Sequence, residues 1–428
     1  MRFALMSTSE GNFLNASPVL TRVTSCPFAS KPAFRLLCKL LYSPTKRILI
    51  NALHLKRKDT QTLKPKPQNI CILVESLAGG GAERSAALLT QMLTEAGYAV
   101  HLVTITDKIG YEFSGRLYNL GKYKNATNGV FNKLKRFQHF KKYLHEQNID
   151  LVLDFRMRRN ALKEYCIQRY LYPGFKVVFM VRSANFGYYF PKPDFVAKRL
   201  FREAELCVLT EAMKHSIEQR FGFKKVKVLS NAIDVSAYQQ DFASLDDVSR
   251  PYILASGRLQ KGVKQFDKLI ITYAKSELPK LGIDLYILGH GEMREELQQL
   301  AKDLNISDNV IFKGFVKHPE PYVAHALFTV LCSAFEGFPR VILESLACGT
   351  PVIAIDCPTG PRELLDGTNG ILVPHQDFDA LRQAMNKLAL DEPTRNRFKA
   401  ASQKSIRKFD ITQVTPQWQS YLNALYDD

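Results

Sequence analysis

The chain has 428 residues, 46% of them hydrophobic and 23% charged, and its formal net charge is +18. This length is more than one hydrophobic core usually holds, and the composition excludes a disordered or low-complexity chain, so we expect two globular domains. No apolar run approaches the roughly 18 residues that a membrane-spanning helix needs.

Residues 1–66 carry most of the excess positive charge. Twelve Lys and Arg residues are opposed by only two acidic residues, which gives +10 of the +18. Apolar residues recur at helical spacing between Phe34 and Leu41, with basic residues between them. This basic amphipathic pattern predicts that residues 31–58 dock on an anionic membrane surface. The alternatives are a helix that packs on the body of the protein and a disordered tail.

The start of the chain lacks the pattern of a secretory signal peptide. Arg2 and the short apolar stretch 3–6 are followed by polar residues, without a sustained hydrophobic run or a small-residue cleavage site. None of the eight cysteines forms a C-x-x-C pair, and most lie in apolar runs, so we expect buried free thiols. The sequence predicts a cytoplasmic chain, peripheral on the inner face of the cytoplasmic membrane if residues 31–58 dock there.

The first half of the fold begins after a linker of alternating Lys and Pro at 64–67. A strand is predicted at 70–74, a turn at Gly79-Gly80-Gly81, a helix at 82–96 and a second strand at 99–104. Such strand–turn–helix–strand units build parallel sheets with helices on both faces. Further strands are predicted at 151–155, 176–181, 206–209 and 226–229.

The same pattern begins again after a polar boundary at 237–250. Strands are predicted at 252–256, 284–288, 310–312, 327–331, 352–355 and 371–373, and helices at 293–304, 339–348 and 416–426. The fold class is therefore α/β, with two doubly wound parallel sheets. We divide the chain into a basic extension (1–66), an N-terminal domain (67–240), a C-terminal domain (241–405) and a C-terminal helical segment (406–428).

Two glutamates, Glu336 and Glu344, stand eight residues apart around the start of the predicted helix 339–348. Pro339 suits the first turn of a helix and Gly349 suits its end, so Glu336 precedes the helix and Glu344 lies inside it. The helix N-terminus between them offers N–H groups to a diphosphate, and each carboxylate can accept hydrogen bonds from sugar hydroxyls. The alternative is a pair of solvated glutamates on a helix surface.

This segment resembles the Glu-x7-Glu signature of the family 4 retaining glycosyltransferases of the GT-B fold. Six further segments are similar to that family and occur in the family's order along the chain, at 256–259, 264–267, 288–292, 309–315, 356–365 and 369–374. The N-terminal half is similar chiefly at residues 79–84, Gly-Gly-Gly-Ala-Glu-Arg. The resemblance implies two Rossmann-like domains with a cleft between them, the first for an acceptor and the second for a nucleotide-sugar donor.

The resemblance also implies roles for individual residues on the donor side. Glu344 would bind the ribose hydroxyls of the donor. Glu336 would contact the transferred sugar, helped by the backbone N–H groups of Gly337 and Phe338. The segment at Gly314 would hold the base, mostly through its backbone.

Arg258 and Lys264 would neutralise the diphosphate as it leaves, which stabilises the charge on the departing group. The family commonly has Lys-Gly-Phe-Asp where this chain has Lys264-Gln-Phe-Asp267, and Lys261 is a nearby competitor, but we prefer Lys264. Gly79, Gly80 and Gly81 permit close approach of the backbone to a phosphate or acceptor. Their spacing differs from G-x-G-x-x-G, which disfavours NAD or FAD.

The acceptor side and the need for a metal are less marked in the sequence. Many relatives place a His at a strand end in the first half, whereas the corresponding strands here end near Asp154 and Arg182. These two residues are candidates to face the acceptor, and structural ion pairing is the alternative for either. Asp377-Phe378-Asp379 resembles a D-x-D metal motif, but its position favours a helix N-cap. We expect neither a metal ion nor another cofactor.

The resemblance implies transfer of a hexose or N-acetylhexosamine, with retention, from a UDP-sugar to a saccharide or glycolipid acceptor in cell-envelope or lipopolysaccharide biosynthesis. One alternative is a nucleotide-sugar epimerase on the same fold, against which the Glu-x7-Glu signature argues. The other is a non-catalytic basic binding protein, for example for nucleic acid. It is disfavoured because the basic excess lies mainly on the extension and not beside aromatic stacking motifs.

Overall fold

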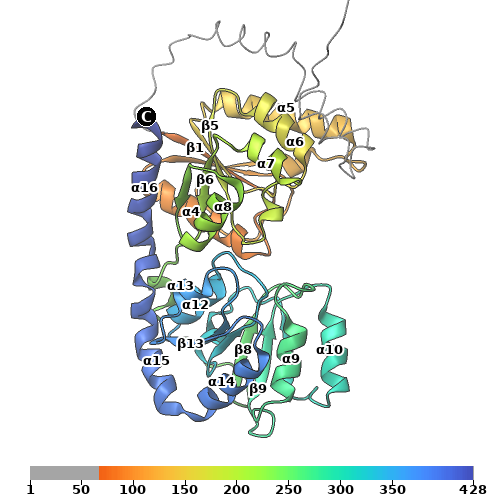
Figure 1. Ribbon diagram of the computed structural model, residues 1–428, viewed down its shortest axis with the longest axis vertical. Helices are drawn as coiled ribbons and strands as arrows, with labels where there is room; N and C mark the ends of the chain where they lie inside the picture. The colour runs from red at the N-terminus through yellow and green to blue at the C-terminus, as the bar shows by residue number, and fades with distance from the viewer. Residues whose placement is uncertain (1–66, 428) are drawn as a thin grey trace, which may run out of the picture. The chain divides into compact units, whose positions relative to one another are not determined.

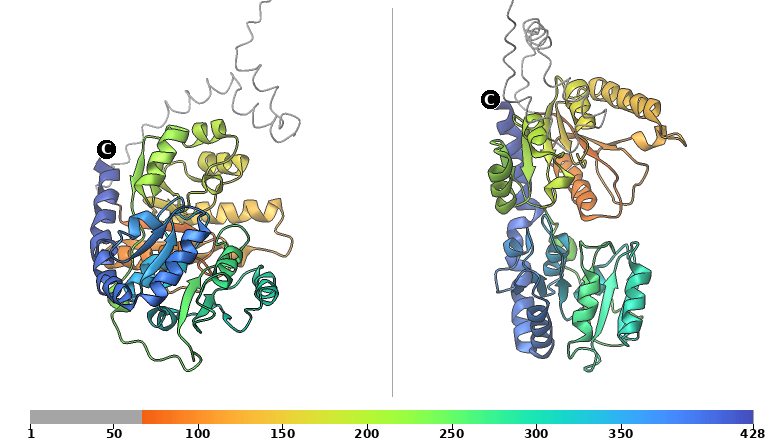
Figure 2. Two further views of the ribbon diagram at one scale, coloured as in Figure 1. Left: turned by 60° about the horizontal axis from the view of Figure 1, so that its bottom comes forward. Right: turned by 45° about the vertical axis from the view of Figure 1, so that its right-hand side comes forward.

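The computed structural model describes residues 67–427, which form two α/β domains, each built on one sheet (Figure 1). The basic extension, with its predicted membrane-docking segment at 31–58, lies outside the described residues. Figure 2 shows the same two sheets with their flanking helices from two other sides. Within residues 67–427, no helix has the length and hydrophobicity needed to cross a bilayer.

The N-terminal domain has seven parallel strands in the order β3-β2-β1-β4-β5-β6-β7. The strands are β1 (Asn69–Val74), β2 (Ala99–Thr104), β3 (Arg116–Asn119), β4 (Leu151–Asp154), β5 (Lys176–Met180), β6 (Glu205–Val208) and β7 (Val226–Val228). The helices are α4 (Gly81–Glu95), α5 (Val130–Glu146), α6 (Ala161–Cys166), α7 (Asp194–Leu200) and α8 (Glu211–Phe221). Short helical turns are η1 (Leu120–Tyr123), η2 (Ile167–Leu171), η3 (Phe186–Tyr188) and η4 (Ser236–Tyr238).

The C-terminal domain has six parallel strands in the order β10-β9-β8-β11-β12-β13. The strands are β8 (Tyr252–Ser256), β9 (Asp284–Leu288), β10 (Val310–Gly314), β11 (Thr329–Leu331), β12 (Val352–Ile355) and β13 (Gly370–Val373). The helices are α9 (Phe266–Ala274), α10 (Arg294–Asp303), α11 (Glu320–Ala324), α12 (Arg340–Ala347), α13 (Pro361–Leu364), α14 (Phe378–Leu390) and α15 (Glu392–Ser405). The turn η5 (Arg407–Phe409) and the helix α16 (Ile411–Asp427) follow.

Strand β1 illustrates why these apolar runs become central parallel strands. Its alternate residues point to opposite faces of the sheet, and both sets are buried. Ile70 and Ile72 belong to one hydrophobic cluster, whereas Cys71 and Leu73 belong to another. A strand that is covered on both faces needs a continuous apolar sequence, because no side chain faces water. The doubly wound prediction for both halves is thus confirmed.

Both sheets have the strand order of a Rossmann-like domain, in which the direction of winding reverses beside the first strand. The reversal lies between β1 and β4 in one sheet and between β8 and β11 in the other. Ligands of doubly wound sheets bind at the carboxyl ends of the strands at this point. The glycine turn 79–81 follows β1, Arg258 follows β8 and Glu336 follows β11. The topology therefore brings the predicted donor residues to the ligand-binding ends of the strands.

The last helix of the chain belongs to the core of the first domain. Val414, Trp418 and Leu422 of α16 are buried in the same cluster as Ile70 of β1. The chain thus crosses back from the C-terminal domain after α15, and α16 runs along the side of the N-terminal sheet (Figure 1). Tyr426 of α16 also donates a hydrogen bond from its hydroxyl to the Asp150 carbonyl oxygen at 2.9 Å.

Two elements differ from the sequence-based prediction. Strand β3 was not predicted, because Arg116–Asn119 is a short edge strand with two polar ends and no apolar run. Helix α16 begins at Ile411, whereas Pro416 was expected to be near its start. Pro416 lies inside the helix, where it lacks the N–H that would donate to the preceding turn. The buried side chains on both sides of it, Val414 and Trp418, hold this first turn against the sheet.

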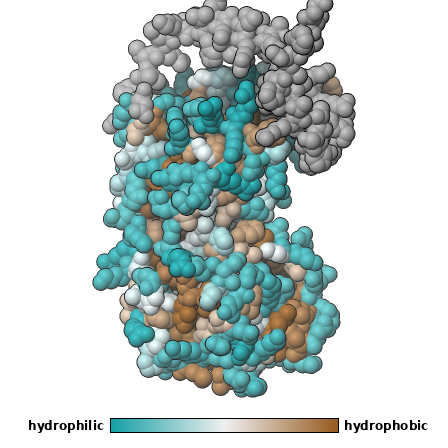
Figure 3. Space-filling view, in the orientation of Figure 1, coloured by the Kyte–Doolittle hydropathy of each residue, from teal (hydrophilic) through white to brown (hydrophobic). Residues whose placement is uncertain are grey.

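The two domains also share apolar contacts. One hydrophobic cluster contains Val181 and Leu209 of the N-terminal domain together with Phe338 and Ile342 of the C-terminal domain. The six cysteines among the described residues are free, as predicted, and four of them are buried. On the face shown in Figure 3, hydrophilic side chains cover most of the surface of residues 67–427, and the hydrophobic residues fall in separate patches.

Candidate active site

Glu336 lies in the loop between β11 and α12, just before the N-terminus of the helix. Its backbone N–H donates to the Pro358 carbonyl oxygen at 2.8 Å, and its own carbonyl oxygen accepts from Ala184 of the N-terminal domain at 2.8 Å. Helix α12 begins at Arg340 with Pro339 at its N-cap, and no side chain caps its first turn. The first N–H groups of the helix are therefore available to an anion beside Glu336.

One carboxylate oxygen of Glu336 accepts two hydrogen bonds from neighbouring side chains. Its Oε1 accepts a hydrogen bond from Lys264 Nζ at 2.7 Å and another from Ser333 Oγ at 2.6 Å. The Lys264 and Glu336 side chains are 17% and 14% exposed, and Ser333 is fully buried. A charge-assisted hydrogen bond at this distance is strong and fixes the orientation of both groups. Glu336 therefore occupies one defined position at the end of β11.

One carboxylate oxygen of Glu344 likewise interacts with two neighbouring side chains. Its Oε1 accepts from Arg340 Nε at 3.1 Å and forms an ion pair with Arg84 Nη1 at 3.0 Å. Arg84 belongs to the first turn of α4 in the N-terminal domain, so this pair joins the two domains. Arg84 also contacts Glu320 Oε1 and the Tyr238 hydroxyl, both at 3.2 Å. The charge of Glu344 raises the pKa of Arg84 above its usual value, which keeps the guanidinium charged.

The two signature glutamates thus share one feature. Among residues 67–427, every hydrogen bond and ion pair to the Glu336 and Glu344 carboxylates goes to Oε1. Each carboxylate is held in place by two donors and keeps the lone pairs of its second oxygen for other partners. Such an oxygen can accept from a hydroxyl group of a sugar or a ribose.

Arg258 connects the donor side with the glycine turn of the N-terminal domain. Its Nη2 donates to the Gly79 carbonyl oxygen at 3.1 Å, although the rest of its side chain is exposed. Gly79 has a φ of +80°, a conformation that favours glycine. Glu83 lies in the first turn of helix α4, next to the glycine residues 79–81. Burial raises the pKa of Glu83, and the charges of Arg258 and Arg182 oppose that shift.

The backbones of the two domains approach each other closely at Gly337. A Cβ atom on Gly337 would stand 2.2 Å from the Arg182 carbonyl oxygen, which is shorter than any non-bonded contact allows. Asn231 of the N-terminal domain donates through Nδ2 to the carbonyl oxygen of the next residue, Phe338, at 3.1 Å. Only glycine permits this approach, so the loop that carries Glu336 is set by the N-terminal domain as well as by its own strand.

Lys264, and not Lys261, is the lysine that reaches Glu336. Lys261 lies beside Asp267 and Glu296 at a small surface pocket instead. The geometry thus favours Lys264 for the role that the resemblance implies. Gly314 ends β10, and its carbonyl oxygen accepts from the Gly289 N–H at 2.7 Å, so the segment predicted to hold the base adjoins the end of β9.

Arg182 follows β5 and, among residues 67–427, forms no ion pair with a carboxylate. Its Nη2 donates to Asn231 Oδ1, its guanidinium lies over the Phe155 ring at 5.3 Å, and its Nε has no hydrogen-bond partner. Burial lowers the pKa of Arg182 to about 10. A buried arginine that lacks a carboxylate partner and lies next to Gly337, in the loop that carries Glu336, suits an anionic ligand.

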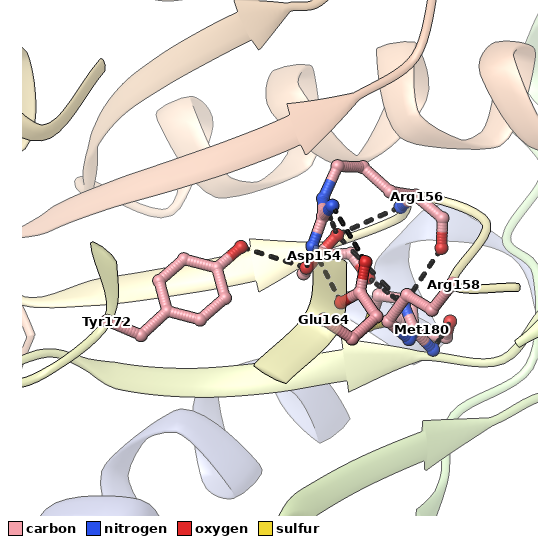
Figure 4. Close-up of polar contacts among 6 residues, drawn as sticks. All are labelled: Asp154, Arg156, Arg158, Glu164, Tyr172 and Met180. Carbon is pink, nitrogen blue, oxygen red and sulfur yellow. Dashed lines mark hydrogen bonds and ion pairs between the residues drawn. The ribbon is translucent and has the colours of Figure 1, made fainter. Parts of the chain in front are cut away.

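Asp154 lies inside a buried network (Figure 4). Its carboxylate accepts from Arg156 Nη2 at 2.6 Å and from the Tyr172 hydroxyl at 2.8 Å, and Arg156 also pairs with Glu164 at 3.2 Å. Burial alone would raise the pKa of Asp154, but the charges of Arg156 and Arg158 outweigh it and hold the pKa below its usual value. Because Asp154 is fully buried, the geometry favours the structural ion pair over a contact with an acceptor.

Arg158 completes this network. Its guanidinium donates to the carbonyl oxygens of Asp154 at 3.1 Å, Arg156 at 2.9 Å and Met180 at 2.9 Å, as Figure 4 shows. It is fully buried, and aromatic rings surround it: Phe179, Tyr189 and Phe201. It thus ties the ends of β4 and β5 together and does not reach the surface.

The D-x-D sequence at 377–379 is placed as predicted at a helix start. Asp377 is the N-cap of α14, and its side chain accepts from the Ala380 N–H at 2.8 Å. Asp379 lies in the first turn of that helix. The motif therefore caps the start of α14.

Sequence reasoning named the two glutamates and Lys264, but not the other residues that hold the glutamates and their loop in place. Four residues were given no role. Arg84 and Asn231 are far in sequence from their partners, whereas Ser333 and Arg340 are near Glu336 and Glu344 but are not part of a pattern that marks them. A signal was present for Arg84, since it follows the Gly-Gly-Gly-Ala-Glu run that carries the resemblance in the first half. Its partner Glu344 lies in the other domain and could not be inferred.

Comparison with solved structures places the architecture in a known class. The structure of Anabaena Alr3699/HepE in complex with UDP-glucose superposes with a TM-score of 0.66 at 18% identity, covering 83% of this chain and 99% of that one. The structure of TarM from S. aureus superposes with a TM-score of 0.67 at 14% identity, covering 83% of this chain and all of the other. The chain has the GT-B fold of two Rossmann-like domains.

The family follows from the sequence comparisons. The family described as Glycosyltransferase Family 4 matches residues 79–237, and the family described as Glycosyl transferases group 1 matches residues 238–405. A Campylobacter jejuni protein, N-acetylgalactosamine-N,N'-diacetylbacillosaminyl-diphospho-undecaprenol 4-alpha-N-acetylgalactosaminyltransferase, is 31% identical over 373 residues, which are 83% of this chain and 99% of the relative. The chain belongs to the family 4 glycosyltransferases.

Proposed function

We propose that this glycosyltransferase moves a hexose or N-acetylhexosamine from a UDP-sugar, with retention of configuration, to a saccharide or glycolipid acceptor of the cell envelope. The observation that supports this best is the state of the two signature glutamates. Glu336 and Glu344 are both held through one oxygen, on either side of the uncapped start of α12. That arrangement suits a donor with a sugar and a ribose on the two sides of a diphosphate.

In this proposal the second oxygen of Glu336 accepts a hydrogen bond from a hydroxyl of the transferred sugar, and that of Glu344 accepts from the ribose. The diphosphate lies at the start of α12, where Arg258 and Lys264 supply positive charge. The bond between the sugar C1 and the phosphate oxygen breaks, and a bond from C1 to the acceptor oxygen forms on the same face. The departing phosphate oxygen takes the proton of the acceptor hydroxyl.

The protein then contributes positioning and charge stabilisation and needs no covalent nucleophile. Arg182 is well placed to add a positive charge near the diphosphate or an anionic acceptor, because it has no acidic partner among the described residues and adjoins Gly337. Asp154 has no part in this scheme. Lys264 and the helix N-terminus supply the charge that a metal ion supplies in other sites, so we propose that the reaction is independent of metal.

The donor and acceptor classes rest on similarity. HepE was solved with UDP-glucose, which supports UDP as the nucleotide. The Campylobacter relative is named for a diphospho-undecaprenol substrate, which supports a lipid-linked saccharide acceptor. The amylovoran biosynthesis glycosyltransferase AmsD of Erwinia amylovora is 23% identical over 371 residues, 83% of this chain and 99% of AmsD. Both relatives are matched over 99% of their length and are named as glycosyltransferases. This favours transfer over epimerisation and over a non-catalytic binding role.

The proposal is tested by thermal unfolding and donor hydrolysis with UDP-, GDP- and ADP-sugars, with EDTA present. We expect one UDP-sugar to raise the melting temperature and to be hydrolysed slowly, and Glu344→Ala to lose both effects. Glu295→Ala is the matched control, because Glu295 is an exposed glutamate in the first turn of α10, away from α12. If no nucleotide sugar stabilises the wild-type protein, the donor site does not work as proposed. If stabilisation appears only after a divalent metal is restored, the metal-free mechanism is wrong.

A further inference from the structure

A second surface of the N-terminal domain combines exposed apolar side chains with lysines. Tyr123, Val130, Phe131 and Leu134 are four of the eleven large hydrophobic residues that are exposed among residues 67–427. Phe131 is 89% exposed, more than any other of them, and Val130 is 70% exposed. We call these four residues, together with the lysines that surround them (Lys122, Lys124 and Lys135), the α5 surface. Helix α5 lies at the top of the domain in Figure 1.

The charge of the chain outside its extension is concentrated at this place. Residues 120–145 contain six Lys and one Arg and no Asp or Glu, which gives a net charge of +7. With +10 on residues 1–66 and +7 on residues 120–145, only +1 of the +18 remains for all other residues. The body of the protein is therefore almost neutral apart from one basic segment, and that segment carries the most exposed aromatic side chain.

The α5 surface is held in its shape by the inner side of the same helix. Phe140, Tyr143 and Leu144 are buried in the core, which fixes the second half of α5. Val130, Phe131 and Leu134 lie on the first turns, at the spacing that puts them on the outer side. Asn132 Nδ2 donates to the Tyr123 carbonyl oxygen at 2.9 Å, so the turn η1 and its lysines are tied to the helix.

A shallow hollow lies between η1 and the start of α5. Its lining combines three ammonium groups with two aromatic rings: Lys122, Lys124, Lys135, Tyr123 and Phe131, with Asn125 and Asn132. An exposed apolar group gains free energy when it enters a hydrocarbon layer, and lysines around it gain when that layer carries negative charge. A phosphate headgroup beside acyl chains offers both at once.

We propose that the α5 surface docks the enzyme on an anionic lipid bilayer, with Phe131 and its apolar neighbours in the acyl-chain boundary and the lysines at the headgroup phosphates. The aliphatic residues Val130 and Leu134 favour a lipid partner over nucleic acid, because a base stacks on rings and gains little from aliphatic side chains. The inference does not depend on the proposed donor or acceptor. It also concerns a different segment from the extension at 31–58.

The first test places a fluorescent reporter in the surface itself. The chain has one tryptophan, Trp418, which is buried in α16, so Phe131→Trp adds a single exposed indole and wild type gives the background. On addition of vesicles of phosphatidylglycerol and phosphatidylcholine to the full chain, we expect the added emission to move to shorter wavelength. Bromine atoms on the acyl chains should quench it. Pure phosphatidylcholine vesicles should give a much smaller effect.

The reporter separates this surface from the rest of the chain. If the chain sediments with anionic vesicles while the Phe131→Trp emission stays unchanged, another segment binds and the proposal is overturned. It is also overturned if the chain does not sediment with them at all, or if single-stranded DNA changes the emission and vesicles do not. None of these readouts needs a donor or an acceptor, so they are independent of the transferase assay.

The second test changes the charge at exposed positions. Lys124→Glu with Lys135→Glu reverses two charges on the α5 surface, and we expect the partition coefficient to anionic vesicles to fall about tenfold or more. Lys399→Glu with Lys404→Glu makes the same change of net charge on exposed residues of α15 in the C-terminal domain. This control should change partition less than about twofold. Equal losses in the two double variants would show that only net charge matters and would refute the α5 surface.

Discussion

Glu336→Gln distinguishes a catalytic carboxylate from a structural one. The substitution keeps the size of the side chain and removes the charge from its contact with Lys264, in a pair whose side chains are 17% and 14% exposed. A hydrogen bond to a charged group contributes about 1.5–3 kcal/mol. Part of it survives with a neutral amide and part is regained from solvent, so we expect unfolding to become easier by about 1 kcal/mol. For a protein of this size the melting temperature then falls by about 1 °C.

The expected effect on catalysis is larger than the effect on stability. If the second oxygen of Glu336 accepts from a sugar hydroxyl in the transition state, the neutral amide should lower kcat for donor hydrolysis about 100-fold. That corresponds to about 2.7 kcal/mol of barrier, more than the loss of stability. The Michaelis constant should change little, because the contact is strongest in the transition state.

The assay measures initial rates of donor hydrolysis at saturating donor, with thermal unfolding in parallel. Ser333→Ala is the control, because it removes the other hydrogen bond to Oε1 and leaves the charge pair in place. We expect that variant to lose a similar amount of stability and less than about tenfold in kcat. If Glu336→Gln keeps kcat within threefold of wild type while its melting temperature falls, the glutamate is structural and the mechanism is wrong.

Three further outcomes are expected. Glu344→Gln should weaken UDP binding about tenfold or more, measured by titration calorimetry, because the ribose loses a charged acceptor; unchanged affinity would place the ribose elsewhere. Gly337→Ala should lower the melting temperature, because the new Cβ would stand 2.2 Å from the Arg182 carbonyl oxygen, and a wild-type value would show that the loop can move. Asp154→Asn should cost about 3–5 kcal/mol in denaturant unfolding, because it leaves Arg156 and Arg158 buried beside a neutral group. The folded-state pKa of Asp154 is lowered, so its contribution to stability is present above about pH 4 and is lost as pH falls further, and the variant should lack that part of the acid dependence.

Every strand of the two sheets except β3 was predicted from the sequence, including the edge strands β7, β10 and β13. Runs such as Ile70–Val74 are apolar at every position because both faces of a central parallel strand are buried, and this pattern needs no knowledge of the neighbours. β3 has no such run, because it is a short edge strand and pairs on one side only. The start of α16 was also missed, since Pro416 outweighs the helical spacing of Val414 and Trp418 until one sees the sheet on which they pack.

In the candidate site, local sequence signals were enough to place some residues, whereas contacts between distant parts of the chain could not be predicted. Glu336 and Glu344 could be placed relative to α12 from local signals, because Pro339 and Gly349 mark the ends of the helix. The partner of Glu344 could not, since Arg84 and Glu344 meet only after both domains have folded. For Asp154 the sequence left two interpretations open. The structure separates them through burial, which depends on Arg156, Glu164 and Tyr172 and on the helices that cover them.

The return of α16 to the first sheet has a consequence for the order in which the protein matures during synthesis. The ribosome makes every strand of the N-terminal domain first, yet Trp418 and Leu422, which cover part of that sheet, emerge only after all strands of the C-terminal domain. Until then the apolar side chains around Ile70 lack their cover. The domain that is made first therefore closes last, after the C-terminal domain already has all its strands. A stop codon before residue 411 would therefore remove part of the core of the N-terminal domain, although every strand of that domain had been made.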